Sequence, residues 1–442
     1  MLLATQAPIG KSFGRSPRTV AEATVPAPGP PHVDTGRAGW SVGLMHHQIA
    51  LVLTSLAVAL LSGCGNTPSD SRSWPGAEWA TSTPEAEGMD PALIQQALDY
   101  AFEAQHNTQG VVVVRNGVIV AQRYSEGRDA ESLGTSWSMG KSVAGALIGL
   151  ARDRGFIESI DQPAADYLPA WRGTPNASIT IRDLLEMRSG LEWNEGRQNA
   201  MLYLDPVDQV AFSLALPLGP TPGTIFNYTS PNSMLLAAIA SAAVGEPARE
   251  FAQRVLFEPI GMPAQWWIDG SGNTMGYCCL DARTRDYARF GLLFARGGAW
   301  RDNQVISSDW VMESTTPLEG APFYGLQWWL NTNGMMIESA PDSLYAARGL
   351  HDQNIYVLPE EDLVVVRNGF YQRFGNGETI RTGSNIIFTR PANDWSDEDF
   401  IGPIIASLGQ ASAANRLDRT TTAADSTARA QAKAALESAR LH

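Results

Sequence analysis

The spacing of hydrophobic residues along the chain changes several times, and each change marks an expected element. After Asp90, the segment PALIQQALDYAFEA has helical apolar spacing and an acidic residue at its start. Two β-rich runs then flank Asn116-Gly117, a dipeptide typical of a two-residue hairpin turn. From Ser138 to Gly155 the apolar positions recur every three or four residues, which predicts another helix.

The order of the later elements predicts the fold class. Residues 156–275 favour helices and loops, and TRDYARFGLLFARGG predicts a further helix that ends at glycine. Strands are expected late, at YGLQWWLN, NIYVLP and DLVVVRN. This order predicts an α/β (α+β) fold, with an antiparallel sheet built from both parts of the chain, flanking helices and an inserted all-helical lobe. A cleft between the two lobes is the expected place for an active site.

The first part of the chain has the pattern of a targeting segment. Residues 49–61 form an uncharged apolar run that is shorter than the ~20 residues of a membrane span, and it is typical of a signal-peptide core. Leu61-Ser62-Gly63-Cys64 follows and resembles a bacterial lipobox, which implies cleavage before Cys64 and lipidation of its thiol. We therefore expect a lipid-anchored protein of the bacterial cell envelope that faces the periplasm, with Gly65 favouring the outer membrane. Met45 is an alternative start.

Composition shifts along the chain give the expected boundaries. They are a leader and lipoprotein signal peptide over 1–63, a polar tether over 64–84, one large domain over 85–410 and a low-complexity tail over 411–442. The formal net charge of −14 argues against nucleic acid and against anionic membrane surfaces as partners. The lipid anchor is thus the one membrane contact that we expect.

The cysteines give neither a disulfide framework nor metal-ligand spacing. There are three, Cys64, Cys278 and Cys279. The adjacent pair Cys278–Cys279 could close a strained ring, but we expect two small buried thiols instead.

The chain offers few choices for nucleophilic catalysis. Outside the leader and the last position, only His106 and His351 could serve a Ser-His-Asp triad, and both G-x-S-x-G matches lie in the leader. Ser138-Met139-Gly140-Lys141 remains, an S-x-x-K at a helix start. Residues three apart share a helix face, so hydroxyl and amine can lie side by side. A buried Lys141 could lose its proton and act as the base.

A second element lies 90 residues after Ser138. Tyr228-Thr229-Ser230 stands directly before an expected helix. A tyrosine beside a lysine ammonium can have a lowered pKa and carry the serine's proton to the leaving group, with Ser230 or Asn232 completing the hydrogen-bond network. The structural alternative is a half-buried aromatic residue with Ser230 as a helix cap.

Together these motifs resemble the serine β-lactamase-related family. S-x-x-K, Y-x-S/N about 90 residues later, and ITIRDLLEMRSGLEW between them carry the resemblance, which runs from about residue 85 to 410. This family includes class C β-lactamases, penicillin-binding DD-peptidases, esterases and nylon-oligomer hydrolases. The resemblance implies a β-lactamase/transpeptidase-like fold, Ser138 as acylated nucleophile, Lys141 as base or proton relay, and Tyr228 as second proton carrier.

The family's third motif, Lys/His-Thr/Ser-Gly on a strand, is not intact. The best match is Ala347-Arg348-Gly349, followed by Leu350 and His351. By the resemblance, Gly349 keeps the close backbone approach, and the N–H groups of Leu350 and Ser138 form an oxyanion hole. Arg348 or His351 could replace the missing cation, and His351 could equally be structural.

The sequence therefore predicts a hydrolase that opens an ester or amide through an acyl-enzyme, without metal or cofactor, and prefers short esters or small amides to β-lactams. The alternatives are a genuine β-lactamase or DD-peptidase, and a non-catalytic lipoprotein that binds cell-wall peptide or a partner.

Overall fold

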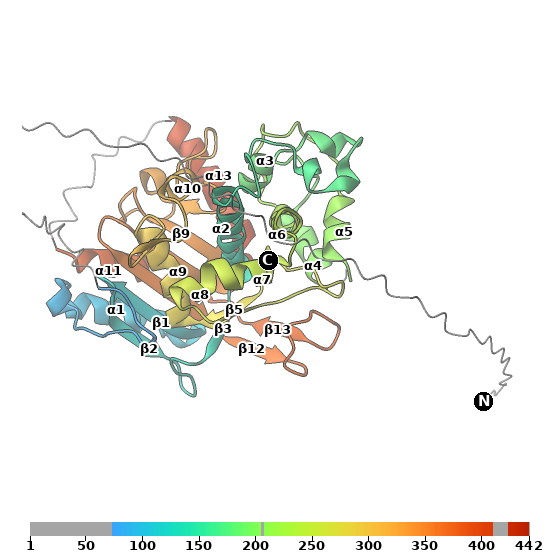
Figure 1. Ribbon diagram of the computed structural model, residues 1–442. Coiled ribbons are helices and arrows are strands. Elements are labelled where there is room, and N and C mark those ends of the chain that lie inside the picture. The colour runs from blue at the N-terminus through green and yellow to red at the C-terminus, as the bar shows by residue number, and fades with distance from the viewer. Residues whose placement is uncertain (1–72, 205–206, 410–422, 442) are drawn as a thin grey trace, which may run out of the picture. The chain divides into compact units, whose positions relative to one another are not determined.

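The computed structural model describes residues 73–204, 207–409 and 423–441 (Figure 1). The expected leader, the signal peptide and Cys64 lie outside these described residues, so the expectation of a lipid anchor stays a prediction. Within them, no helix is both long enough and apolar enough to span a membrane.

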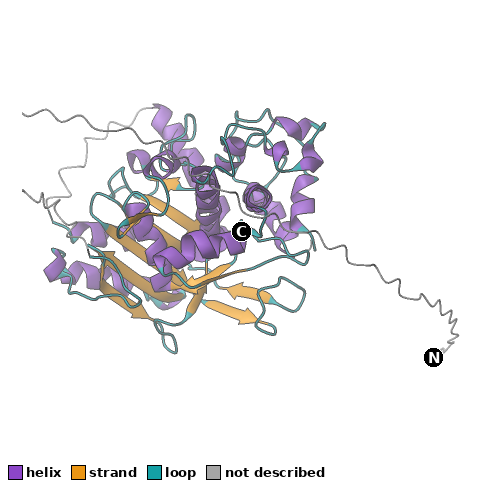
Figure 2. Cartoon of the chain, in the orientation of Figure 1, coloured by secondary structure: helices purple, strands orange, loops and turns teal. Residues whose placement is uncertain are grey.

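A six-stranded antiparallel sheet is the centre of the larger lobe (Figures 1 and 2). Its strand order is β2-β1-β11-β10-β9-β8, so the first hairpin pairs with strands from the end of the domain. The expected sheet built from both parts of the chain is confirmed. In sheet order the strands are Val118–Tyr124, Thr108–Arg115, Leu363–Gly369, Gln353–Leu358, Tyr345–Gly349 and Trp329–Leu330. The strand expected over YGLQWWLN is therefore reduced to two residues.

Side chains that alternate along β1 form two separate cores, one on each face of the sheet. Val111 and Val113 pack with α1 (Pro91–Ala101) and α11 (Asp397–Ala406). Val112 and Val114 belong to the larger core, which includes α2 (Gly140–Asp153) and α9 (Thr284–Ala295). Because both faces are covered, these strands read as continuous valine runs.

The inserted helical lobe and the smaller elements complete the chain. The helices are α3 (Ile181–Leu185), α4 (Glu195–Leu204), α5 (Gln209–Leu214), α6 (Ser230–Val244), α7 (Ala248–Ala252), α8 (Glu258–Ile260), α10 (Ser308–Ser314) and α13 (Ala423–Leu441). Three small antiparallel sheets contain β3 (Leu133–Thr135), β5 (Leu280–Arg283) and β4 (Ala264–Trp266); β12 (Tyr371–Phe374) and β13 (Ile386–Thr389); and β6 (Ala299–Trp300) and β7 (Asn303–Gln304).

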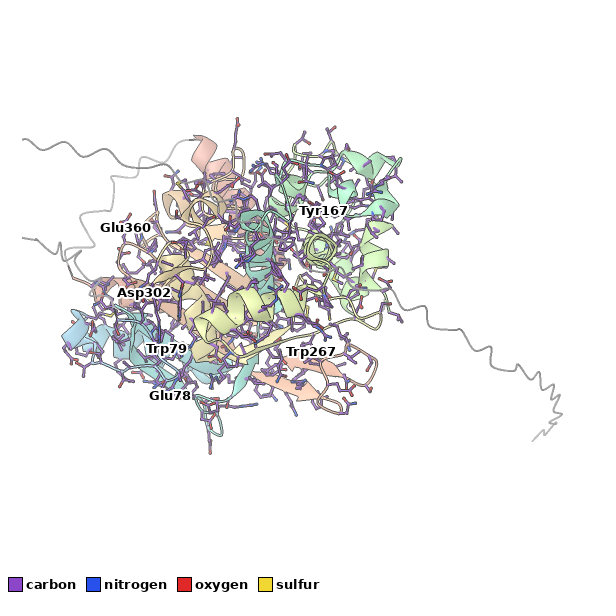
Figure 3. All side chains as sticks on the ribbon, viewed as in Figure 1. Glu78, Trp79, Tyr167, Trp267, Asp302 and Glu360 are labelled. Carbon is purple, nitrogen blue, oxygen red and sulfur yellow. A yellow bond between two sulfur atoms is a disulfide. The ribbon has the colours of Figure 1, made fainter. Side chains whose placement is uncertain are left out.

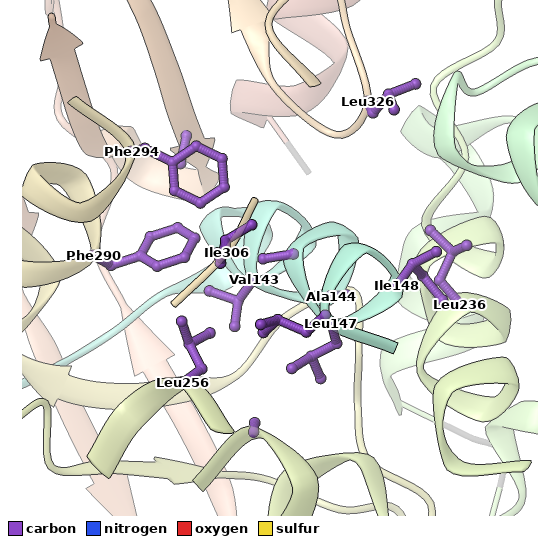
Figure 4. Close-up of a cluster of buried hydrophobic side chains, with 14 of the residues drawn as sticks. Val143, Ala144, Leu147, Ile148, Leu236, Leu256, Phe290, Phe294, Ile306 and Leu326 are labelled. Carbon is purple, nitrogen blue, oxygen red and sulfur yellow. The ribbon is translucent and has the colours of Figure 1, made fainter. Parts of the chain in front are cut away.

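Helix α2 lies between the two lobes and is buried from Gly140 to Ala151 (Figure 4). Its apolar side chains belong to one buried cluster with Leu236 of α6 and Phe290 of α9, and Figure 4 shows Ile148 of α2 beside Leu236. Gly149 lets α2 approach α10, because a Cβ at this position would lie 2.3 Å from the buried ring of Trp310. The helix that carries the S-x-x-K motif is thus held from every side.

The structure corrects two expected boundaries. Residues 73–84, expected as part of a tether, pack on the folded body: Trp79 is buried (Figure 3), and Ser82 pairs with Ile119 through its backbone. The ring of Trp74 makes an edge-to-face contact with the ring of Trp300, with 5.4 Å between their centres. In the tail expected over 411–442, residues Ala423–Leu441 form helix α13, which contacts the domain. The first segment packs through its tryptophans and the second through buried alanine. The overall composition of the two segments, which is polar or low in complexity, does not predict these contacts.

We expect Gly149→Ala to destabilise the protein by about 1–3 kcal/mol, because the added methyl group overpacks against Trp310. Urea unfolding followed by tryptophan fluorescence measures this loss. In the background Trp310→Leu, which makes room, the same change should be much less destabilising. Equal losses in both backgrounds would contradict the proposed packing of α2.

Candidate active site

Ser138 lies in a sharp turn between β3 and α2. The expected helix starts later than Ser138: a 3₁₀ turn over Trp137–Met139 precedes α2. Trp137 has a φ of 43°, a conformation that residues other than glycine rarely adopt and that is often found at functional sites. Its indole N–H donates to Thr389 Oγ1 at 2.8 Å, which anchors the turn to β13. The partly exposed Ser138 is therefore presented at the end of a buried helix.

Lys141 follows one turn later and faces Ser138, as the S-x-x-K spacing predicts. Its Nζ donates to Ser138 Oγ at 2.8 Å and to the carbonyl oxygen of Tyr277 at 3.1 Å. The side chain is 1% exposed, and its ammonium lies 5.0 Å from the ring centre of Tyr228. Burial lowers the pKa of Lys141 to about 8, against an opposing effect of the Glu195 charge. A substantial fraction of neutral amine is thus available near neutral pH, as a general base requires.

Tyr228 shares this buried space, but its pKa moves opposite to the sequence expectation. Burial raises the pKa of Tyr228, the charge of Glu195 raises it further, and a hydrogen bond with Ser138 and the charge of Arg348 oppose this. The expected lowering is wrong, because the phenol is 5% exposed and has a carboxylate nearby. The phenol of Tyr228 is therefore protonated at neutral pH.

Glu195 is a site residue that the sequence did not indicate. It is 4% exposed, and its Oε2 accepts from the Ser230 backbone N–H at 2.9 Å and from the Trp193 indole N–H. The hydroxyl of Ser230 donates to the other carboxylate oxygen. Ser230 thus binds Glu195, and Thr229 is the helix N-cap, without a side-chain capping bond. A single glutamate at the start of α4 gives no periodic or motif signal, so only the fold identifies it as a site residue.

Asn232, the other candidate for the network, lies apart from the nucleophile. It accepts a hydrogen bond from Ser189 at 2.8 Å and donates to the Leu184 carbonyl at 3.4 Å. These bonds join α6 to α3 and to the loop after it, which is a structural role.

The strand β9 places Gly349 directly against the nucleophile turn. A Cβ on Gly349 would lie 2.4 Å from the Ser136 carbonyl oxygen and 3.1 Å from the Ser138 backbone nitrogen. Only glycine fits, as the resemblance implies. Leu350 follows directly, at the start of a 3₁₀ turn, Leu350–Asp352.

Neither candidate cation is placed to bind a substrate carboxylate. Arg348 is 4% exposed and donates to Asp397 of α11 at 2.6 Å, on the face of the sheet opposite α2. Burial, aided by the Arg367 charge, lowers the pKa of His351 to about 4, so its imidazole is neutral at neutral pH. His351 Nδ1 lies 2.7 Å from Thr389 Oγ1, the same hydroxyl that holds Trp137. This shared contact makes His351 part of the support for the nucleophile turn.

Cys278 and Cys279 form a vicinal disulfide, contrary to the expectation of two thiols. Both are buried, as expected, and Cys279 has a φ of 67°. The pair follows Tyr277, whose carbonyl holds Lys141. The tight turn that presents this carbonyl brings the two sulfur atoms together, which spacing in the sequence does not reveal.

In the described ranges, no cluster of three or more His, Cys, Asp or Glu side chains is arranged to hold a metal ion.

An antiparallel sheet with an inserted helical lobe, and a serine–lysine–tyrosine cluster at their junction, define the class of S-x-x-K proteins with the β-lactamase/transpeptidase fold. The Beta-lactamase family matches residues 91–379, more than half of the chain. The chain therefore belongs to the β-lactamase family.

Two curated relatives are named as hydrolases. The 6-aminohexanoate-dimer hydrolase of Paenarthrobacter ureafaciens is 23% identical over 295 residues, which is 59% of this chain and 72% of the relative. The esterase/β-lactamase LipL of Mycobacterium tuberculosis is 27% identical over 156 residues, 35% of this chain and 34% of its own length. These similarities support a hydrolase.

Solved structures show the same fold. A family VIII carboxylesterase has a TM-score of 0.54 at 15% identity, covering 72% of this chain and 96% of its own. A penicillin-binding protein homologue from Caulobacter crescentus has a TM-score of 0.52 at 15% identity, covering 63% and 91%. At such identities the likeness concerns the fold alone.

The pKa of Lys141 predicts the pH dependence of serine acylation. If the neutral amine is the base, kcat/KM for an aryl acetate should rise about tenfold per pH unit below the pKa of about 8 and level off above it. Because the Glu195 charge raises this pKa, Glu195→Gln should move the inflection to lower pH. A profile that stays flat through the neutral range would contradict Lys141 as the base.

Proposed function

We propose that the protein is a serine hydrolase that cleaves an ester or amide through an acyl-enzyme at Ser138. The observation that carries this proposal is the 2.8 Å hydrogen bond between Ser138 Oγ and the buried Nζ of Lys141, a base with a pKa of about 8. A protein that only binds peptide would not need a desolvated lysine at its serine.

The geometry supports a sequence of proton transfers. Neutral Lys141 takes the Ser138 proton as Oγ attacks the substrate carbonyl, and the backbone N–H groups of Ser138 and Leu350 stabilise the oxyanion. Tyr228, kept neutral by burial, donates its phenolic proton to the leaving group and regains one from the Lys141 ammonium. Water then repeats the sequence in reverse to release the acid and restore Ser138.

Ester or small-amide substrates fit this site better than β-lactams. A β-lactam carries a carboxylate, but Arg348 is bound to Asp397 and His351 is neutral. A cavity of about 490 Å³ beside Tyr228 has Glu195 in its wall and no arginine or lysine among its described lining residues. Such a wall disfavours an anion. The two relatives named above are a 6-aminohexanoate-dimer hydrolase and an esterase/β-lactamase; these names agree with ester or amide cleavage and do not separate it from β-lactam hydrolysis.

We expect Ser138→Ala to abolish ester turnover while changing the free energy of unfolding by at most about 1–2 kcal/mol. Lys141→Ala and Tyr228→Phe should each slow acylation by orders of magnitude, and the double variant should be little worse than either, because the groups act as a unit. Steady-state kinetics with urea unfolding as the control measure this. Full activity in Ser138→Ala would refute the assignment.

We expect an aryl acetate or butyrate to have a higher kcat/KM than a chromogenic cephalosporin. The missing cation misplaces a β-lactam, and a misplacement of about 1 Å lowers the rate by roughly a hundredfold. Both substrates are assayed with one preparation, with Ser138→Ala as the blank. A preferred cephalosporin would favour the genuine β-lactamase, and no turnover or acylation of either would favour the non-catalytic lipoprotein.

A further inference from the structure

The C-terminal helix α13 packs over the candidate active site. It contacts β9 and the turn Leu350–Asp352 of the sheet lobe, and α4 of the helical lobe. Ala432 is fully buried in a cluster that also contains Met187, Tyr228 and Phe323. Arg429 donates to the Asn333 carbonyl at 2.8 Å. The helix, drawn in red in Figure 1, therefore contacts both lobes at their junction.

The same helix forms part of the cavity beside Tyr228. Gln431, Ala434 and Ala435 line it from α13. The facing wall is mainly the segment Thr224–Tyr228, with Phe323 from the loop before β8. The cavity of about 490 Å³ thus has one wall that belongs to a segment outside the 91–379 family match.

The position of Tyr228 decides which part of a substrate enters this cavity. Tyr228 interacts with Ser138 and also lines the cavity. In the proposed reaction, the leaving group accepts the proton of Tyr228 and must therefore lie on its side of the scissile bond. The acyl part lies on Ser138 and is directed away from this proton donor.

We propose that α13 is a specificity element that forms the outer wall of the leaving-group pocket and limits how large a leaving group the enzyme accepts. This inference rests on the proposed function, because it assigns the cavity through the role of Tyr228. The alanines of α13 set the size of the pocket, because their small side chains let the helix lie close to both lobes and occupy little of the cavity.

The packing of α13 is separable from the fold of the domain. Most of the stability of a helix in a protein comes from tertiary packing, so the position of α13 depends on contacts such as that of Ala432. An aspartate at a fully buried site carries a charge that must reach water. Ala432→Asp should therefore displace α13, whereas Ala430→Asp, the same change at an exposed position, should not.

The experiment compares three full-length variants with the parent protein. Ala432→Asp opens the pocket, Ala434→Phe fills it from an exposed position that lines it, and Ala430→Asp is the matched control. Three esters are used: methyl acetate, naphthyl acetate with a large leaving group, and methyl octanoate with a large acyl group. Each kcat/KM is divided by that of the parent on the same ester, which removes differences in intrinsic reactivity. Hydrogen exchange over residues 426–437 reports whether the helix is docked.

In Ala432→Asp we expect faster exchange over α13 and a gain of roughly tenfold or more for naphthyl acetate. Ala434→Phe should lower naphthyl acetate hydrolysis by a similar factor, and changes for methyl acetate and for Ala430→Asp should stay within about threefold. Unchanged naphthyl acetate rates despite faster exchange would overturn the proposal. A gain confined to methyl octanoate would overturn the assignment to the leaving group.

The proposed function fails in a different way. If the parent protein hydrolyses none of the esters and Ser138 is not acylated, the hydrolase assignment is wrong. If methyl acetate is hydrolysed through Ser138 but the α13 variants have the same relative kcat/KM values for the three esters as the parent protein, only the assignment of α13 as a specificity element is wrong.

Discussion

The removal of the Lys141 amine from water is the interaction on which the site depends. A pKa of about 8 instead of 10.5 means that the folded protein disfavours the ammonium by about 3 kcal/mol. Above pH 10.5 the amine is neutral in both the folded and the unfolded state, and there is no penalty. As pH falls from 10.5 to about 8, the unfolded chain takes up a proton that the folded protein does not, so the free energy of unfolding decreases. At neutral pH the folded state therefore bears the penalty. The buried helix α2 holds this amine 2.8 Å from Ser138 Oγ, where we propose that it acts as the base.

The groups around Lys141 hold its amine in this buried position through close backbone packing and a few buried hydrogen-bond acceptors. Gly349 brings β9 within reach of the Ser138 backbone, and the Tyr277 carbonyl accepts from Lys141. Glu195 limits how far the pKa of Lys141 falls and raises that of Tyr228. One carboxylate thus acts on both proposed proton carriers: it raises the pKa of the Lys141 amine and helps to keep the Tyr228 phenol protonated.

The sequence predicted the parts of this arrangement that depend on local pattern. Valine runs around Asn116-Gly117 predicted the hairpin of β1 and β2, and the spacing from Ser138 to Lys141 placed both groups on one face. It could not predict Glu195, because that side chain meets Ser230 only through the fold. The pKa of Tyr228 and the packing of α13 were missed for the same reason: both depend on burial by distant segments.

Covalent labelling tests the central claim that burial makes Lys141 the base for Ser138. The intact protein is treated with a fluorophosphonate, and peptide mass spectrometry locates the adduct. We predict one adduct per chain, on Ser138, formed in the parent protein and at a rate lower by orders of magnitude in Lys141→Ala. Labelling at another residue, or unchanged labelling of Ser138 in Lys141→Ala, would contradict the account.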